Sequence, residues 1–121
     1  MSKTNSIIAL IEAGIRAEGL RQKAIANNVA NIETPGYRRI DIKFEELLAK
    51  LLDSSGSVDL SKLEPQIYRP RQTPVKSDGN DVSLENEVGA IIKNSLRYKT
   101  YIRLLNKKYR WIELAINVGA Q

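Results

Sequence analysis

Residues 84–116 place apolar side chains at alternating intervals of four and three, and this spacing restricts the possible folds most. A heptad pattern of this length predicts one long helix that supercoils with another helix. Ser83 is the expected N-cap and Gly119 the expected stop. At 1.5 Å per residue, a helix over residues 83–118 is roughly 50 Å long, which exceeds the diameter of a compact domain of this size. The predicted seam comprises Leu84, Val88, Ile91, Ser95, Tyr98, Ile102, Leu105, Tyr109, Ile112 and Ile116.

The same segment carries a second apolar stripe. Trp111 in this stripe either packs under the middle of the chain or contacts another subunit. We favour the second interpretation, because two long helices with doubled apolar faces leave more apolar surface than one molecule can bury. The stripe comprises Leu96, Leu104, Trp111, Leu114 and Val118.

Residues 4–32 predict a second long helix, and it also has two apolar faces. Pro35 disfavours helical geometry before it, so this helix should end by Thr34, and Gly36 permits a sharp turn. A surface helix usually has one apolar stripe, so two stripes predict two sets of neighbours. The bulky face comprises Ile7, Ile8, Ile11, Ile15, Ile25, Val29 and Ile32, and the small face comprises Leu10, Ala13, Ala17, Leu20 and Ala24.

Three amides stand near the end of this helix, at Asn27, Asn28 and Asn31. Asn27 and Asn31 are four residues apart and share a face. A polar amide in an apolar seam fixes register and partner, so these side chains are interface candidates. The alternative is that they are solvated or cap the helix end.

The middle of the chain predicts smaller elements. Asp41 is a candidate cap for a short helix over Phe44 and the following leucines, and residues 54–57 should end that helix. Residues 66–69 and 72–76 favour either a hairpin of edge strands or a flexible loop. Residues 78–80 predict a turn before the last helix, because the ligand pattern of a calcium loop is missing. The expected fold is all-α: an antiparallel coiled coil of the terminal helices, with a short helix and a loop or small β-hairpin between them.

This organisation predicts one structural domain in three segments, residues 1–34, 35–82 and 83–121.

The chain has no cysteine and no histidine, which excludes disulfides, thiol nucleophiles, imidazole bases and the usual zinc ligands. There is no phosphate loop or dinucleotide fingerprint. We therefore expect no enzymatic activity, no metal and no cofactor. Residues 1–15 do not show a cleaved secretory signal, and no run of about 18 apolar residues predicts a membrane span.

A basic run within the last helix raises the main alternative function. Basic residues with interleaved tyrosines can bind phosphate and stack on bases. These charges spread over the whole surface outside the seam, so we do not expect nucleic-acid binding. A basic coiled-coil nucleic-acid-binding protein, adaptor or chaperone remains the alternative. The run comprises Lys93, Arg97, Lys99, Arg103, Lys107, Lys108 and Arg110.

Two motifs carry a family resemblance. Residues 26–31 (ANNVAN) and 34–37 (TPGY) resemble the N-terminal motif of the bacterial flagellar axial proteins, which form the rod and hook. Residues 78–88 (DGNDVSLENEV), 94–98 (NSLRY) and 104–109 (LLNKKY) resemble the C-terminal half of the short proximal rod proteins of that family. Asp81 and Lys99 are mild departures, since asparagine and glutamine are usual there.

The resemblance implies a structural subunit of the proximal rod of the flagellar basal body. Such subunits leave the cell through the type III export apparatus without a cleaved signal and polymerise in the periplasm. The rod serves as drive shaft and export channel. The implied partners are copies of the chain, other rod proteins (FlgC and FlgF), the adaptor FliE, the MS-ring protein and the export apparatus, with no nucleic acid and no small-molecule substrate.

The resemblance also assigns residues. The implied assembly interface comprises Leu20, Ala24, Asn27, Asn28, Asn31, Pro35, Gly36, Tyr37, Val88, Ile91, Tyr98, Ile102, Leu105, Tyr109, Ile112 and Ile116. A weaker implication concerns recognition by the export gate, for which the residues are Ile7, Ile8, Leu10 and Ile11.

Overall fold

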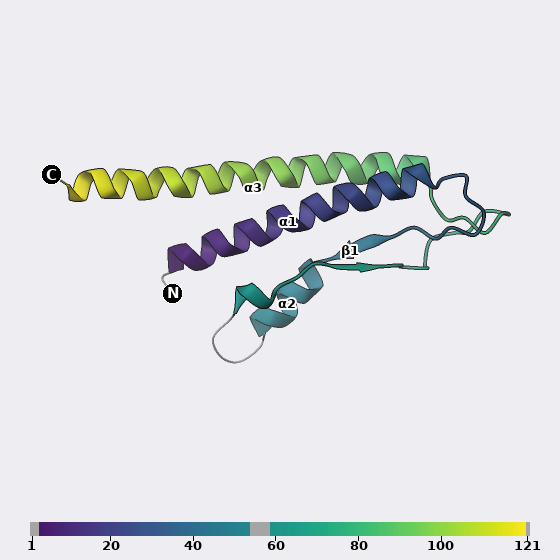
Figure 1. The fold of residues 1–121 in the computed structure, drawn as a ribbon, viewed down its shortest axis with the longest axis horizontal. Helices are drawn as coiled ribbons and strands as arrows, with labels where there is room; N and C mark the ends of the chain where they lie inside the picture. The colour runs from purple at the N-terminus through teal and green to yellow at the C-terminus, as the bar shows by residue number, and fades with distance from the viewer. Residues whose placement is uncertain (1–2, 54–58, 121) are drawn as a thin grey trace.

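A computed structural model describes residues 3–53 and 59–120. Two long helices dominate it, and the smaller elements lie between them in sequence (Figure 1). The order is α1 (Lys3–Ala30), β1 (Asp41–Lys43), α2 (Glu45–Asp53), the 3₁₀ helix η1 (Leu60–Lys62), β2 (Gln66–Tyr68) and α3 (Leu84–Gly119). The predicted long terminal helices with small elements between them are confirmed.

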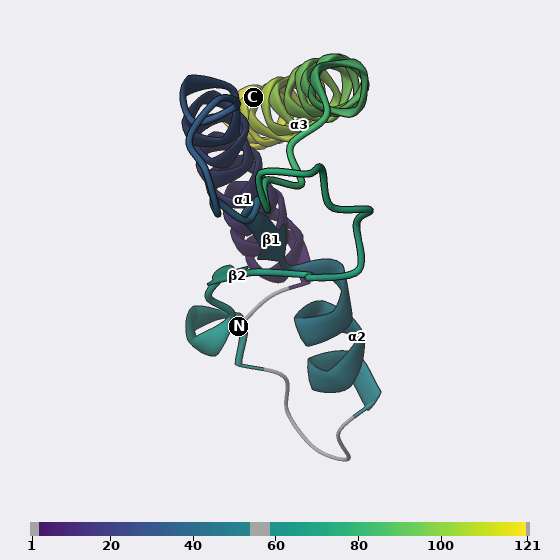
Figure 2. The ribbon, with the colours of Figure 1, turned by 90° about the vertical axis from the view of Figure 1, so that its right-hand side faces the viewer.

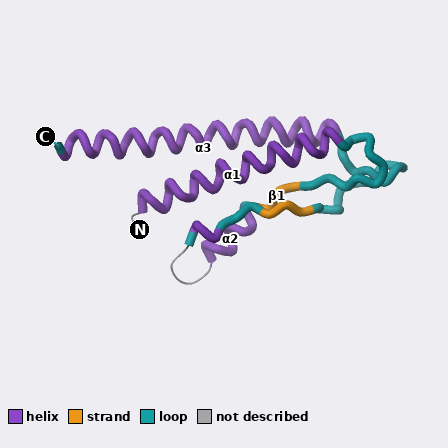
Figure 3. Tube along the Cα trace, in the orientation of Figure 1, coloured by secondary structure: helices purple, strands orange, loops and turns teal. Residues whose placement is uncertain are grey.

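The two long helices run side by side in opposite directions, so both chain ends lie at the same end of the molecule (Figure 1). Their contact is close at Gly14, where an added Cβ atom would lie 2.5 Å from the ring carbon Cζ of Tyr101. Helix α3 is longer and extends past the start of α1 (Figure 3). The last turns of α3 therefore have no neighbour among the described elements.

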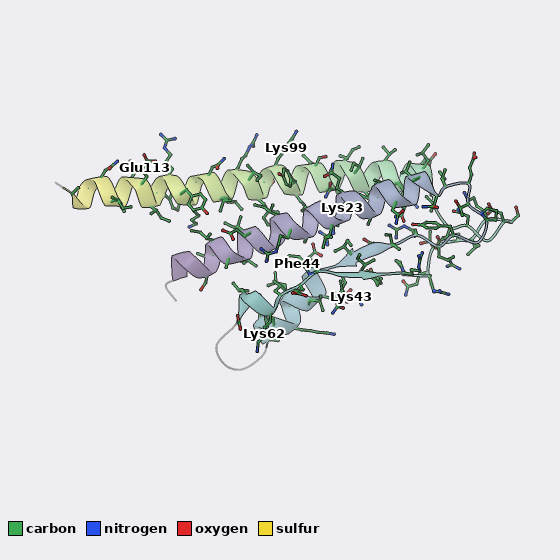
Figure 4. The ribbon with its side chains drawn as sticks, viewed as in Figure 1. Lys23, Lys43, Phe44, Lys62, Lys99 and Glu113 are labelled. Atoms are coloured by element: carbon green, nitrogen blue, oxygen red, sulfur yellow. The ribbon has the colours of Figure 1, made fainter. Side chains whose placement is uncertain are left out.

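The apolar core lies on the other side of α1. The small face of α1 packs there through Ala13 and Ala17 against Phe44 and Leu63, with leucines of α2 and η1 around them. Phe44 lies between α1 and α2 (Figure 4). Viewed along the long axis, β1, β2 and α2 all lie on one side of the helix pair (Figure 2). The opposite side of the pair is left uncovered by these elements.

The start of the short helix differs from the expectation. Asp41 does not cap it: Asp41 begins strand β1, and its Oδ1 accepts a hydrogen bond from the backbone N–H of Ile42 at 2.8 Å. Helix α2 begins at Glu45, and its first turn closes between the N–H of Leu48 and the carbonyl of Phe44 at 2.9 Å. The predicted stop at residues 54–57 lies outside the described residues.

The predicted strand over residues 66–69 forms, but its partner is not the segment 72–76. Strand β2 pairs antiparallel with β1, with Ile42 opposite Ile67. Their side chains share one face of the ladder, where Ile42 is buried (4% exposed) and Ile67 remains largely exposed (62%). Residues 72–76 stay irregular, because Pro70 and Pro74 beside and within this segment lack the N–H that a ladder needs.

The ends of the long helices follow the sequence signals with one exception. Helix α1 ends at Ala30, before Thr34 as predicted. Ser83 is the N-cap of α3, and its hydroxyl accepts from the N–H of Asn86 at 3.4 Å. Gly119 does not stop α3: it is the last helical residue, and Ala120 caps the helix with φ −82°. The left-handed turn that would favour glycine is not used here.

Candidate functional site

The face of α3 that meets α1 is not the predicted apolar seam. The buried residues of α3 are Glu87 and Asn94, one heptad apart, and Tyr101 follows one heptad later against Gly14. This contact line is rotated roughly 60° about the helix axis from the centre of the seam. Within the chain, α3 is therefore held by polar groups along its inner line.

The seam itself is only partly covered by this arrangement. Ile91, Ile102, Leu105 and Ile112 are half-buried at the edge of the contact. The remaining seam positions, Leu84, Val88, Ser95, Tyr98, Tyr109 and Ile116, are exposed. A heptad seam of this kind normally packs against a helix, and α1 occupies only one edge of it.

A buried carboxylate holds the middle of the helix pair. Glu18 of α1 is 1% exposed and accepts from Asn94 at both its backbone carbonyl (2.7 Å) and Oε2 (2.9 Å). Its Oε1 accepts from Arg21 Nη1 at 2.5 Å and from Arg97 Nε at 2.8 Å. Arg21 also pairs with Glu45 at the start of α2. Burial lowers the pKa of Arg21, but the pairs with Glu45 and Glu18 outweigh it and raise the pKa overall.

Asn28 organises the end of the pair where the chain turns. Its side chain is fully buried, and Oδ1 accepts from the Tyr37 hydroxyl and from the backbone N–H of Ile40, both at 2.9 Å. Its Nδ2 donates to the carbonyl of Ile40 at 2.9 Å and to Glu87 Oε1 at 3.3 Å. This one amide therefore connects α1, the segment after the turn, and α3. Burial raises the pKa of the Tyr37 hydroxyl, although the nearby charge of Arg69 lowers it in part.

Two further carboxylates bind the arginines that follow the turn. Glu87 Oε1 accepts from Arg39 Nε at 3.1 Å. Asp81 accepts from the backbone N–H of Arg39 at 2.6 Å and from Arg38 Nε at 3.0 Å. Both carboxylate side chains are fully buried, so these pairs satisfy charges that would otherwise be costly to bury.

The two glycine turns lie against each other and bring the two sequence motifs together. Gly36 has φ 75° and Gly79 has φ 86°, the left-handed region that glycine adopts readily. The N–H of Gly36 donates to the carbonyl of Asp78 at 2.9 Å. Asn80, fully buried, donates to the carbonyls of Asn31 (2.8 Å) and Thr34 (2.9 Å). We call this joined region, residues 28–40 and 78–87, the polar joint.

The remaining motif residues lie on the rim of the polar joint. Asn27 is exposed and Asn31 half-buried, and Asn31 Nδ2 donates to the backbone carbonyl of Asn27 at 2.8 Å. Thr34 Oγ1 donates to Asn31 Oδ1 at 3.1 Å. Pro35 is exposed. The sequence interpretation that asparagines cap the helix end describes Asn31 well, since its side chain binds the end of α1.

The other assigned residues of α1 vary in exposure. Ala24 is buried and Leu20 half-buried. Of the residues assigned to export recognition, Ile7 is exposed, Ile8 and Leu10 are half-buried and Ile11 is buried against the molecule. Of these four residues, only Ile7 is exposed, at 39%.

The second apolar stripe of α3 lies in the open. Trp111 is 50% exposed, and the ammonium groups of Lys107 and Lys108 lie 5.2 and 4.6 Å from its ring centroid. The interpretation that Trp111 packs under the middle of the chain is therefore wrong, because that segment lies on the far side of α1 (Figure 1). The exposed stripe comprises Leu96, Leu104, Trp111, Leu114 and Val118.

Two kinds of feature, metal clusters and membrane-spanning helices, are absent from the described ranges. Within residues 3–53 and 59–120, no cluster of acidic side chains is placed to hold a metal ion. No helix in these ranges combines the length and apolarity that crossing a bilayer requires.

Sequence reasoning missed Glu18, Glu87 and Asn94 as the centre of the helix contact. For Glu18, the sequence does contain one indication: this charged residue interrupts an apolar face of α1. Glu87 and Asn94 both fall within the segments that carry the family resemblance. Their partners on α1 lie 59 and 76 residues away in the chain, at Asn28 and Glu18, and no local pattern reports such a pairing.

Comparison with known proteins finds matches among flagellar rod proteins, in line with the resemblance of the two motifs. Residues 14–38 match the family model described as flagella basal body rod protein. The flagellar basal body rod protein FlgB of Bacillus subtilis is 25% identical, over 98% of this chain and 99% of that protein. FlgB of Cereibacter sphaeroides is 31% identical over 87% and 93%, and FlgB of Aquifex aeolicus is 31% identical over 69% and 70%. The family match includes the end of α1 and the turn at Gly36. With relatives of this identity and coverage, the chain belongs to the FlgB family of flagellar basal body rod proteins.

Proposed function

We propose that this chain is a structural subunit of the flagellar basal-body rod and that it polymerises through its two terminal helices. The observation that carries the proposal is the exposed apolar surface of α3. Large apolar side chains are exposed along its whole length, from Leu84 at 54% to Val118 at 73%. Surface of this extent marks a protein interaction site, and its helical spacing suits neighbours that are themselves helices.

The free end of α3 gives this proposal a physical mechanism. Beyond residue 105, Lys108 and Ile112 are half-buried, and the other described residues of α3, Tyr109 included, are exposed. A helix end that packs on nothing is marginal in water, because most helical stability comes from tertiary packing. The end of α3 would therefore fray in the dilute subunit and become ordered when neighbours cover it, so that folding and assembly are coupled.

The family places this subunit among flagellar basal-body components, and the finer setting belongs to the proposal. Its neighbours would be copies of itself, the rod proteins FlgC and FlgF, the adaptor FliE and the MS-ring protein. It would reach the periplasm through the type III export apparatus without a cleaved signal. The exposed members of the assigned interface are available for such contacts: Asn27, Pro35, Gly36, Val88, Tyr98, Tyr109 and Ile116.

A binding role for nucleic acid is less well supported. The ammonium groups of Lys107 and Lys108 lie against the ring of Trp111. That ring is therefore not a free face on which a base could stack. The other basic residues of α3 spread around the helix, and Arg97 is paired with Glu18. A structural role in the rod accounts for the apolar surface, which a nucleic-acid site would leave unexplained.

The test uses a double variant, Leu96→Asp with Leu104→Asp. Both side chains are exposed in the subunit, so the fold should survive while the assembly surface becomes charged. We expect loss of motility and loss of the chain from isolated basal bodies in a strain that has only this variant. Asn106→Asp with Asn117→Asp is the matched control, because it adds the same charge at exposed polar positions that belong to neither apolar stripe of α3. Normal incorporation of the leucine variant would contradict assembly through this surface.

A further inference from the structure

An apolar groove lies on the open side of the helix pair, near the polar joint. It holds about 550 Å³ and is lined by Ile25 and Val29 of α1 and by Leu84, Val88 and Ile91 of α3. The elements β1, β2 and α2 all lie on one side of the pair (Figure 2). Three of the lining residues, Leu84, Val88 and Ile91, belong to the heptad seam that α1 leaves partly uncovered.

The groove also contains an unsatisfied acceptor. Glu87 lines it, and Oε2 of this buried carboxylate has no hydrogen-bond partner among the described residues, whereas Oε1 binds Asn28 and Arg39. A buried polar atom without a partner is rare and costly in native proteins. An occupant of this groove should therefore be apolar with a positive charge at its edge.

The chain itself carries a surface of this chemistry at its other end. Leu104, Trp111 and Val118 follow one another at heptad spacing with Leu114 beside them, and Lys107 and Lys108 lie over Trp111. This end of α3 extends past the start of α1 (Figures 1 and 4). This end carries an exposed apolar stripe with basic residues along its edge, and within residues 106–118 only Lys108 and Ile112 are half-buried.

We propose that the C-terminal end of α3, residues 104–118, docks into the groove between α1 and α3 of a second copy of this chain. The inference rests on the proposed function and names the contact that would propagate the polymer. Apolar side chains would fill the groove, and the lysines would bring positive charge toward the carboxylate of Glu87.

The positions of the two surfaces determine the kind of polymer. The groove lies at the turn end of the molecule and the docking face at the end with both termini. Parallel docking displaces successive copies by about 23 to 26 residues of helix, or roughly 35 to 40 Å along the axis. Different surfaces of the two copies meet in such a contact, so it does not close on itself and extends as a filament.

The absence of cysteine makes this contact directly testable in the full-length chain. Chains with Val88→Cys are mixed with chains carrying Leu114→Cys and oxidised at high concentration. We expect a disulfide-linked mixed dimer in excess over either homodimer, by about tenfold or more, because proximity governs the reaction. Glu113→Cys is the control for Leu114→Cys, being one residue earlier and on a different side of α3, and Lys93→Cys, in another groove beside Arg39, is the control for Val88→Cys.

The single tryptophan gives an independent reading. Trp111 should become buried on docking, so its fluorescence emission should shift to shorter wavelength as concentration rises. Val88→Asp should abolish this shift and Lys93→Asp should not. Equal disulfide yields from the control pairs, a predominance of homodimers, or an unchanged emission at every concentration would overturn the docking. Incorporation into basal bodies that is lost on charging Leu96 and Leu104 would then still support the rod function.

Discussion

The two ends of the helix pair are built on opposite principles. At the turn end, the polar joint buries Asn28, Asn80, Asp81 and Glu87 and gives nearly every one of their polar atoms a partner within the chain. At the other end, α3 exposes Leu104, Trp111 and Val118, at 42%, 50% and 73%, among the described residues. The polar joint fixes the geometry of the subunit, and the free end is available for other molecules.

This contrast explains why hydrogen-bonding residues cluster where the family resemblance is strongest. Directional hydrogen bonds specify one geometry, whereas apolar packing tolerates several. The turn end must hold α1 and α3 at a defined angle and register, and hydrogen bonds achieve this. A surface meant for a partner must instead gain free energy when it is covered, and apolar side chains provide that gain.

The largest expected effect breaks the polar joint. Asn28→Ala removes the partner of the Tyr37 hydroxyl and of both backbone groups of Ile40. Because buried groups lose their hydrogen bonds, we expect the free energy of unfolding to fall by about 2–4 kcal/mol. Urea denaturation followed by circular dichroism measures the change.

Asn27→Ala is the matched control for this variant, since Asn27 is an exposed amide on the same helix. It should change stability by less than about 0.5 kcal/mol. Similar losses in the two variants would show that the buried amide has no special role and would remove the basis of the contrast between the two ends.

A smaller effect concerns the middle of the helix pair. At Gly14 an added methyl group would overlap the Tyr101 ring, so Gly14→Ala should destabilise the subunit by about 1–3 kcal/mol. At Gly89, also helical, an added Cβ meets nothing within 4 Å, and Gly89→Ala should stabilise by about 0.5–1 kcal/mol. Thermal unfolding of both variants gives the sign of each change, and two changes of the same sign would contradict the close helix approach.

The smallest expected effect is the pH dependence from Glu45. Burial opposes ionisation there, but the bonds to Arg21 and the backbone outweigh it, so the pKa of Glu45 is lowered on folding. A lowered folded pKa stabilises the protein above the unfolded value and loses that contribution as the pH falls through about 4 and below. The side chain is 60% exposed, so solvent screening keeps the effect small.

Urea midpoints at neutral pH and near pH 3 measure this dependence in the parent and in Glu45→Gln. We expect a slightly smaller acid destabilisation in the variant, because it has no charge to lose at this position. A larger acid destabilisation in Glu45→Gln than in the parent would be inconsistent with the pair to Arg21.

The sequence was sufficient for the long elements and insufficient for what joins them. Pro35, Ser83 and the heptad spacing predicted both long helices, because these signals are local. The partner of β2 could not be read, since β1 lies more than twenty residues earlier and offers only Asp41–Lys43. The inner line of α3 was missed because Glu87 and Asn94 are buried only through distant partners on α1. The exposed stripe around Trp111 could be predicted. Its residues recur at helical spacing, and the two long helices together carry more apolar surface than one chain can bury.

The central claim is that α3 is held by the chain at one end and by other subunits at the other, and hydrogen exchange along α3 tests it most directly. In the dilute subunit we predict slow amide exchange over residues 84–101 and fast exchange over residues 106–118. In isolated basal bodies both stretches should be slow. Slow exchange over residues 106–118 in the dilute subunit, or fast exchange there in the basal body, would contradict the claim.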